Sequence, residues 1–121
     1  MTKKILTVDD SKTMRDMLLM TLKRAGYDVV QAEDGRQGLD KLEANGADVI
    51  ITDINMPVMD GITFIKECRK RSAYASTPIL TLTTESSDAK KAEGRAAGAT
   101  GWIVKPFNPE KLIRVVEKVC P

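Results

Sequence analysis

Histidine is absent from this sequence, and its two cysteines, Cys68 and Cys120, form no CxxC pair. Zinc and copper sites typically contain imidazole or thiolate ligands, so the sequence disfavours both kinds of site. We expect the two thiols to be reduced and to face the core. Only five aromatic residues occur, which leaves few side chains to flank a flavin.

Long apolar runs and a charge excess of one sign are also missing. Only residues 5–8 separate the basic start of the chain from Asp9, too few for a signal peptide, and no segment approaches the ~20 apolar residues of a membrane-spanning helix. The 19 basic and 17 acidic residues are scattered. We therefore expect a cytoplasmic monomer that contacts neither membrane nor nucleic acid. The nearest approach to a basic cluster is interpreted as a solvated helix end; its members are Lys66, Arg69, Lys70 and Arg71.

The length and overall composition are those of one ordinary globular domain. The chain has 121 residues, 42% of them hydrophobic and 30% charged, without repeats or low-complexity tracts. A chain of this size buries a single hydrophobic core. We therefore expect residues 1–121 to form one domain.

Short apolar runs alternate with longer segments of helical period, which is typical of a parallel sheet wrapped by helices. The predicted strands are residues 4–8, 28–32, 47–52, 78–82 and 101–104. The predicted class is α/β: a flavodoxin-like, doubly wound five-stranded parallel sheet of order 2-1-3-4-5 with five helices. A six-stranded dinucleotide fold is the alternative, and the chain is too short for it.

Several polar residues mark where the helices should begin. Ser11 and Asp34 are suited to cap the first two helices, the third should begin near residue 62, and Pro109 suits the first turn of the last. The fourth helix is expected over residues 87–97. Its apolar face should consist only of alanines, which bury little area and would anchor it weakly; these are Ala89, Ala92, Ala96 and Ala97.

Three carboxylates follow two strands that should lie side by side. Asp9 and Asp10 end the first predicted strand and Asp53 ends the third, and ligands bind such folds at the carboxyl ends of these strands. Like charges about 4 Å apart repel by about 4 kcal/mol at an effective dielectric constant of 20, so the cluster needs a cation. Oxygen ligands favour Mg²⁺, Mn²⁺ or Ca²⁺, with Mg²⁺ the best match. The alternative is that each aspartate merely caps a helix or turn.

Two further residues should reach the same edge of the sheet. Lys105 follows the fifth strand and could reach an anion bound there, and Thr83 follows the fourth with a hydroxyl able to donate to a phosphoryl oxygen. Pro106 allows a cis Lys105–Pro106 bond, since cis peptide bonds occur at X-Pro in tight turns.

These residues closely resemble the motifs of the response-regulator receiver family, in particular its CheY-type single-domain chemotaxis members. The resemblance covers the whole chain. It rests on residues 8–11 after the first strand, 53–57 and 59–61 after the third, Thr83 after the fourth and 105–107 after the fifth.

The resemblance implies a site and its chemistry. Asp53 would be the phosphoacceptor, and Mg²⁺ would be bound by Asp10, the carboxylate of Asp53 and the backbone carbonyl of Asn55, with Asp9 acting through a water. Lys105 would neutralise phosphoryl charge and Thr83 would follow the phosphoryl group.

By the same resemblance, a histidine kinase would supply the phosphoryl group to a signalling protein that is not itself an enzyme, although it assists its own phosphorylation and dephosphorylation. The switch surface would include Trp102, Thr84 and Glu85 beside the fourth helix. Trp102 stands where the family usually has Tyr or Phe, Thr84 where it has a small residue, and Asn55 with Glu85 could position the hydrolytic water.

Three functional hypotheses follow. The first is a chemotaxis switch that binds a flagellar motor switch protein, with a phosphatase as a further partner. The second is a phosphorelay intermediate or phosphate sink that exchanges the group with histidine phosphotransfer domains. The third is a Mg²⁺-dependent phosphatase or a flavin binder, which Asn55 in place of a second aspartate and the scarcity of aromatics disfavour.

Overall fold

Five parallel strands form one sheet in the order β2-β1-β3-β4-β5 in the computed structural model, which describes residues 2–120. The predicted fold is therefore confirmed. The strands are β1 Lys4–Val8, β2 Asp28–Ala32, β3 Val49–Thr52, β4 Ile79–Thr83 and β5 Gly101–Val104. The helices are α1 Lys12–Arg24, α2 Gly35–Asn45, α3 Gly61–Lys70, α4 Asp88–Ala97 and α5 Pro109–Val119, with a short 3-10 helix at Ser72–Tyr74.

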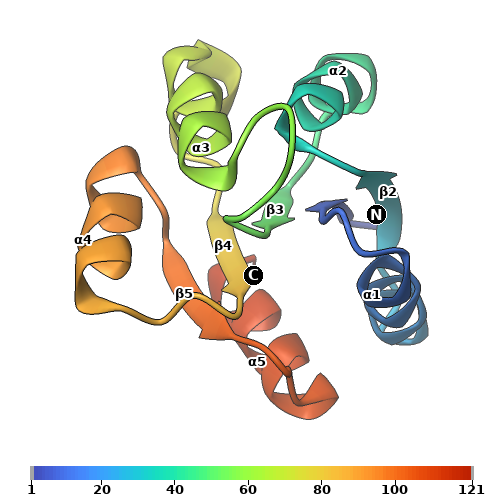
Figure 1. Ribbon diagram of the computed structural model, residues 1–121. Coiled ribbons are helices and arrows are strands. Elements are labelled where there is room, and N and C mark those ends of the chain that lie inside the picture. The colour runs from blue at the N-terminus through green and yellow to red at the C-terminus, as the bar shows by residue number, and fades with distance from the viewer. Residues whose placement is uncertain (1, 121) are drawn as a thin grey trace.

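Helices cover both faces of the sheet. Figure 1 shows α2, α3 and α4 on one side and α1 and α5 on the other. Because successive side chains of a strand point to opposite faces, each strand feeds two cores. In β1, for example, Leu6 joins the core under α2 and α3, and Ile5 joins the core under α1 and α5.

The helix starts follow the local capping signals. Ser11 accepts a hydrogen bond from the backbone N–H of Met14, and Asp34 accepts one from that of Gln37, as predicted for the first two helices. Asp60, Ser87 and Asn108 cap α3, α4 and α5 in the same way. Each cap satisfies a backbone donor that the first helical turn leaves unpaired.

Two predicted strand boundaries were displaced. β3 begins at Val49, two residues later than predicted, because Asp48 uses its carboxylate to accept the Lys4 N–H at 2.8 Å. The fourth strand runs one residue further along the chain than predicted, over Ile79–Thr83.

The predicted apolar face of α4 was wrong. Only Ala97 of the four alanines is buried, together with Gly94, while Ala89, Ala92 and Ala96 are exposed. Trp102 accounts for the face that α4 turns inward, because a Cβ at Gly94 would lie 2.5 Å from Cζ3 of the indole. The helix therefore turns its side-chain-free position toward the ring.

The basic cluster of α3 is only partly solvated, contrary to the prediction. Lys66 and Lys70 are exposed. Arg69 instead donates to the carbonyl oxygens of Tyr74, Thr77 and Gly98, and so ties the C-terminal end of α4 to α3.

Both cysteines are free, as expected. Cys68 is buried, and burial raises the pKa of its thiol to about 12; Cys120 is partly buried. None of the helices within residues 2–120 is long and apolar enough to span a bilayer.

Candidate functional site

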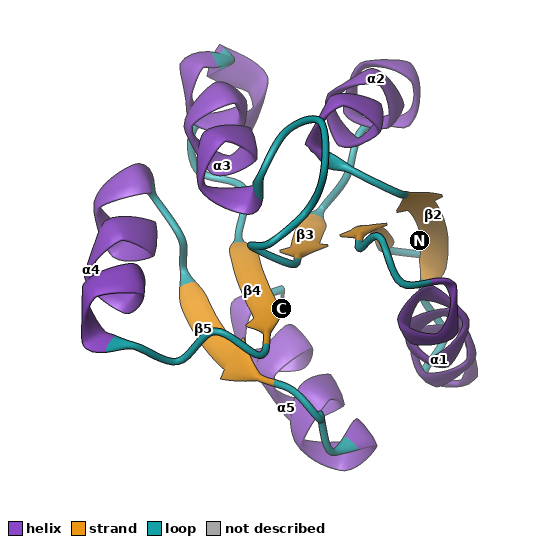
Figure 2. Cartoon of the chain, viewed as in Figure 1, coloured by secondary structure: helices purple, strands orange, loops and turns teal. Residues whose placement is uncertain are grey.

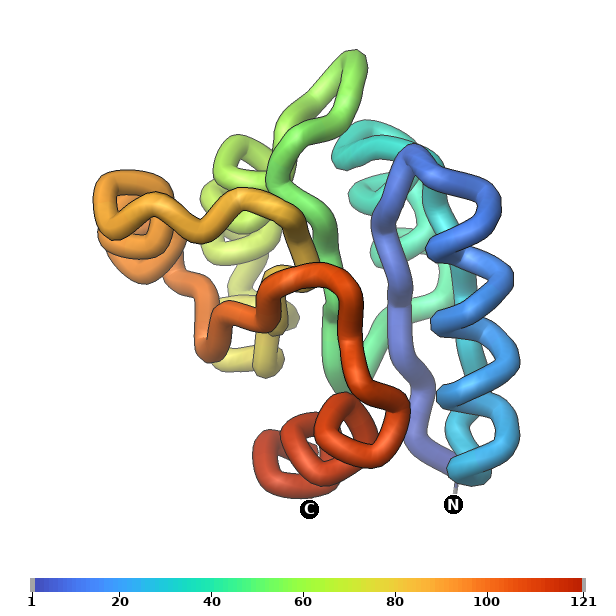
Figure 3. Tube along the Cα trace, turned by 60° about the horizontal axis from the view of Figure 1, so that its bottom comes forward, coloured from blue at the N-terminus to red at the C-terminus, as the bar shows by residue number. Residues whose placement is uncertain are grey.

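The carboxyl ends of the strands meet at one edge of the sheet. Figure 3 shows the β1–α1 turn and the β3–α3 loop at this end, opposite the start of β1 and the end of α5. The β3–α3 loop, residues 53–60, arches between the sheet and α3 (Figure 2). The chain closes this loop tightly, since Gly61 N–H donates to Ile54 O and a Cβ at Gly61 would overlap the Asp53 carbonyl.

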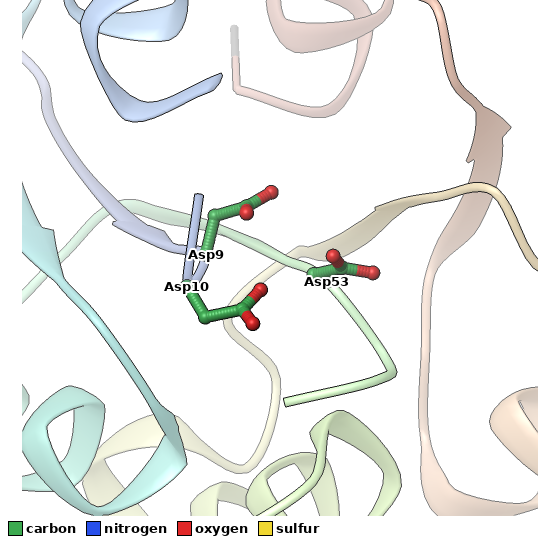
Figure 4. A group of neighbouring side chains, drawn as sticks. All are labelled: Asp9, Asp10 and Asp53. Carbon is green, nitrogen blue, oxygen red and sulfur yellow. The ribbon is translucent and has the colours of Figure 1, made fainter. Parts of the chain in front are cut away.

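Asp9, Asp10 and Asp53 come together at this edge, as predicted. One carboxylate oxygen of each lies within 4.8 Å of those of the other two. Figure 4 shows Asp9 and Asp10 at the end of β1, with Asp53 opposite them at the end of β3. Asp9 and Asp53 are buried, with 1% and 8% of their surface exposed, whereas Asp10 is exposed.

Lys105 lies between the two buried carboxylates. Its Nζ is 2.9 Å from Asp9 Oδ2 and 2.9 Å from Asp53 Oδ2. The Lys105–Pro106 bond is cis, the isomer considered from the sequence.

The electrostatics of this contact follow from burial and pairing. Burial raises the pKa of Asp9 above its ordinary value, although Lys105 and the N–H of Ser11 oppose the rise. Burial alone would lower the pKa of Lys105, but the hydrogen bonds and charges of Asp9 and Asp53 outweigh it and raise that pKa. The ammonium is therefore firmly charged.

The remaining polar contacts fix Asp9 and Asp53 but not Asp10. Asp9 Oδ1 accepts from Ser11 N–H at 2.9 Å, and Asp53 Oδ1 accepts from Ile54 N–H at 2.7 Å. Within residues 2–120 no hydrogen bond reaches the Asp10 carboxylate. This side chain is thus the freest of the three to meet a ligand.

These residues fit a divalent cation. All the candidate metal-ligand atoms at the site are oxygens. Two of the carboxylates are buried and share the single ammonium of Lys105, and Asn55 follows Asp53 in the same loop. Hard cations such as Mg²⁺ prefer oxygen ligands. The acidic triad is compatible with a metal site.

Thr83 ends β4, the predicted switch residues Thr84 and Glu85 follow it, and Trp102 is the second residue of β5. Thr83 is fully buried, and its Oγ1 accepts from Glu85 N–H at 3.2 Å, which leaves its hydroxyl hydrogen for another acceptor. Trp102 Nε1 donates to the Glu85 carbonyl at 2.9 Å. Thr84 is exposed beside them.

Sequence reasoning missed two contributors. Arg15 donates to the backbone carbonyl of Asp9 at 2.7 Å, and Gly94 makes room for Trp102. A basic residue one helical turn after the Ser11 cap was the available signal for the first; no local signal marked the second.

Known proteins resemble the chain along nearly its whole length. Residues 5–117 match the model of the response regulator receiver domain. The chain is 44% identical to chemotaxis protein CheY1 of Helicobacter pylori, covering 96% of this chain and 95% of that protein. It is 42% identical to the chemotaxis protein CheY homolog of Campylobacter jejuni, with 96% and 91% covered. Among solved structures, Vibrio cholerae chemotaxis protein CheY4 is 54% identical with a TM-score of 0.95, covering 98% of this chain and 99% of that one.

Proposed function

Because the chain belongs to the response regulator receiver family and is a CheY-like chemotaxis protein, we propose that Asp53 is the residue that accepts the phosphoryl group. A receiver domain implies a histidine kinase as phosphodonor, and the receiver is a phosphoacceptor rather than a true enzyme. The observation that carries the proposal is the pairing of Lys105 Nζ with both Asp53 and Asp9 at 2.9 Å, at the edge where the acidic triad gathers.

In the proposed reaction, a carboxylate oxygen of Asp53 attacks the phosphorus of a phosphohistidine. A P–O bond forms, the P–N bond breaks, and the electron pair leaves with the imidazole of the kinase. Asp53 Oδ1 is held by the Ile54 N–H and Oδ2 by Lys105. Such fixed orientation supplies much of the acceleration in phosphoryl transfer, which needs positioning and charge stabilisation above all.

Asp10, the carboxylate of Asp53 and the backbone carbonyl of Asn55 would hold Mg²⁺, with Asp9 acting through a water; Mn²⁺ has similar ligand preferences. The bound cation would offset the negative charge of the phosphoryl oxygens. Lys105 would offset part of the same charge, because its ammonium already lies against Asp53.

Thr83 would couple the modification to the surface. Its hydroxyl hydrogen is available to a phosphoryl oxygen, and movement of Thr83 would disturb its bond with the Glu85 N–H. Glu85 in turn accepts from Trp102. Thr84, Glu85 and Trp102 therefore form the proposed switch surface beside α4, and the charged oxygens of the phosphoryl group on Asp53 are the stimulus.

We propose a cytoplasmic monomer of one domain whose switch surface binds a flagellar motor switch protein, with a phosphatase or histidine phosphotransfer domain as further partners. The competing role is a phosphate sink that exchanges the group without contacting the motor. Capture of a purified motor switch protein only by the phosphorylated form supports the first role, whereas phosphoryl exchange without capture supports the second.

The test of the site is modification by a small acyl phosphate with Mg²⁺, followed by intact-protein and peptide mass spectrometry. One phosphoryl group should appear on Asp53 and be absent from Asp53→Asn. Asp60→Asn is the matched control, because Asp60 lies in the same loop but caps α3. Continued modification of Asp53→Asn would overturn the assignment.

A further inference from the structure

Arg15 contacts the site without belonging to the proposed set of reacting residues. It lies in the first turn of α1 with only 14% of its side chain exposed. Its Nη1 donates to the backbone carbonyl of Asp9 at 2.7 Å. A charged donor on a neutral carbonyl gives one of the stronger kinds of hydrogen bond.

The contacted carbonyl controls the placement of Asp10. The oxygen of Asp9 shares a rigid peptide plane with the nitrogen and Cα of Asp10, so a donor that fixes this oxygen also fixes the orientation of the next residue. The Asp9 N–H donates to Ala32 O and the Asp9 carboxylate accepts from Ser11 N–H. Arg15 thus holds the peptide plane that precedes Asp10, and the Ser11 N–H holds the plane that follows it. The Asp10 carboxylate itself has no hydrogen-bond partner among residues 2–120.

The guanidinium is itself held from the β2–α2 turn. Arg15 Nη2 lies 3.6 Å from Glu33 Oε1, and the Glu33 backbone N–H donates to the side chain of Gln37 at 3.1 Å. The Arg15 carbonyl also accepts from Gln31 Nε2 at 2.9 Å. The turn that follows β2 therefore supports the turn that follows β1.

We propose that Arg15 is a positioning residue for divalent-cation binding: by holding the Asp9 carbonyl it presents the Asp10 carboxylate to the ion. This inference rests on the proposed function, because it presumes the cation site. Residues that hydrogen-bond to metal ligands and orient them commonly lower metal affinity about 10- to 100-fold when they are replaced.

The chain offers a matched control for a merely structural role. Arg71 also donates to a backbone carbonyl, that of Glu67 at 2.8 Å, and also pairs with a surface glutamate, Glu43 at 3.1 Å. It follows α3 and has no contact with the acidic triad among its hydrogen bonds and ion pairs. Its loss should affect folding stability without affecting ion affinity.

The experiment is an NMR titration of each protein with Mg²⁺ alone, alongside urea unfolding in EDTA. Arg15→Met should bind Mg²⁺ roughly tenfold more weakly than the unmodified chain, with the largest loss of response at the Asp10 amide. Arg71→Met should bind it equally well. Arg15→Lys should fall between, since one ammonium replaces the two guanidinium nitrogens that reach the Asp9 carbonyl and Glu33 separately.

Each result decides between the claims. Equal Mg²⁺ affinity of Arg15→Met and the unmodified chain would refute the positioning role while leaving the cation site intact. Failure of the unmodified chain to bind Mg²⁺ would instead refute the proposed function. If Arg15→Met does not fold in EDTA, Arg15→Lys carries the comparison, and unchanged affinity in that variant overturns the inference.

Discussion

Replacing Lys105 by methionine removes the ammonium that lies between two buried carboxylates while keeping most of the side-chain volume. The side chains of Asp9 and Asp53 are 2% and 10% exposed, and that of Lys105 is 13% exposed. Water can therefore do little to replace the lost charge. The variant leaves two aspartates facing each other without a cation.

The size of the effect follows from the distances. Each 2.9 Å contact corresponds to an attraction of about 6 kcal/mol at an effective dielectric constant of 20, opposed by a desolvation penalty of several kcal/mol for the ammonium. Breaking a buried pair by removing one partner typically costs about 3 to 5 kcal/mol. Protonation of Asp9, whose pKa burial already raises, limits the loss. We therefore expect a loss near the lower end, about 3 kcal/mol of unfolding free energy at neutral pH in EDTA.

Urea unfolding with and without saturating Mg²⁺ measures both the loss and its cause. A ligand that binds only the folded state stabilises it in proportion to the logarithm of its affinity. The carboxylates of Lys105→Met lack their ammonium partner and should attract the cation more strongly, so Mg²⁺ should stabilise this variant more than the unmodified chain. Lys12→Met is the control, because Lys12 pairs with Asp16 at the same 2.9 Å but is 81% exposed, and exposed pairs contribute little. Unchanged stability of Lys105→Met in EDTA would refute the account of the cluster.

Two further predictions concern packing and titration. Gly94→Ala places a Cβ 2.5 Å from Trp102 Cζ3, so it should lower the unfolding free energy by about 1 to 3 kcal/mol and shift the emission of the indole. Gly26→Ala is the control. Its new Cβ has no atom within 4 Å but its φ of +96° is strained, so it should change stability without shifting the emission. Asp9→Asn should raise the urea midpoint in EDTA at neutral pH. The folded-state pKa of Asp9 lies above its unfolded value of 3.8, so Asp9 favours folding at acid pH and this contribution is lost as the pH rises through the folded pKa. The increase in urea midpoint caused by Asp9→Asn should therefore shrink on acidification. A gain independent of pH would contradict the raised pKa.

The topology and most element boundaries were predictable because their signals are local. The capping residues Ser11 and Asp34 mark helix starts in the sequence itself, and the alternation of strands and helices leaves few topologies for a right-handed parallel sheet. Both signals agree with the global fold, which is typical of natural sequences.

The orientation of α4 was not predictable from its own residues. Its alanines carry little burial energy, so the contact between Gly94 and Trp102, eight residues apart in the chain and on different elements, decides which face turns inward. Val58 in the β3–α3 loop is a similar case: its positive φ of 67° is a conformation that β-branched residues rarely adopt, so its residue type did not predict it.

The acidic triad and Lys105 were predictable because strand ends in this topology share one edge. The role of Arg15 had a weaker signal, its place one helical turn after Ser11, because a side chain that binds a backbone carbonyl leaves no mark on the residue it contacts. The sequence also did not indicate which aspartate would have hydrogen-bond and ion-pair partners: Asp9 accepts from Ser11 and pairs with Lys105, whereas Asp10 does neither.

The contacts of Lys105 set two demands against each other. Its ammonium stabilises the fold because it lies against Asp9 and Asp53, yet Asp53 Oδ2 cannot be both tightly paired with Lys105 and fully available to an incoming phosphorus or cation. A stronger ion pair between Lys105 and Asp53 would favour the unphosphorylated state and weaken Asp53 as a nucleophile, and a weaker one would leave buried charge unpaired. Sharing one ammonium between two carboxylates resolves this conflict, since Lys105 can keep Asp9 as a partner whenever Asp53 is engaged elsewhere.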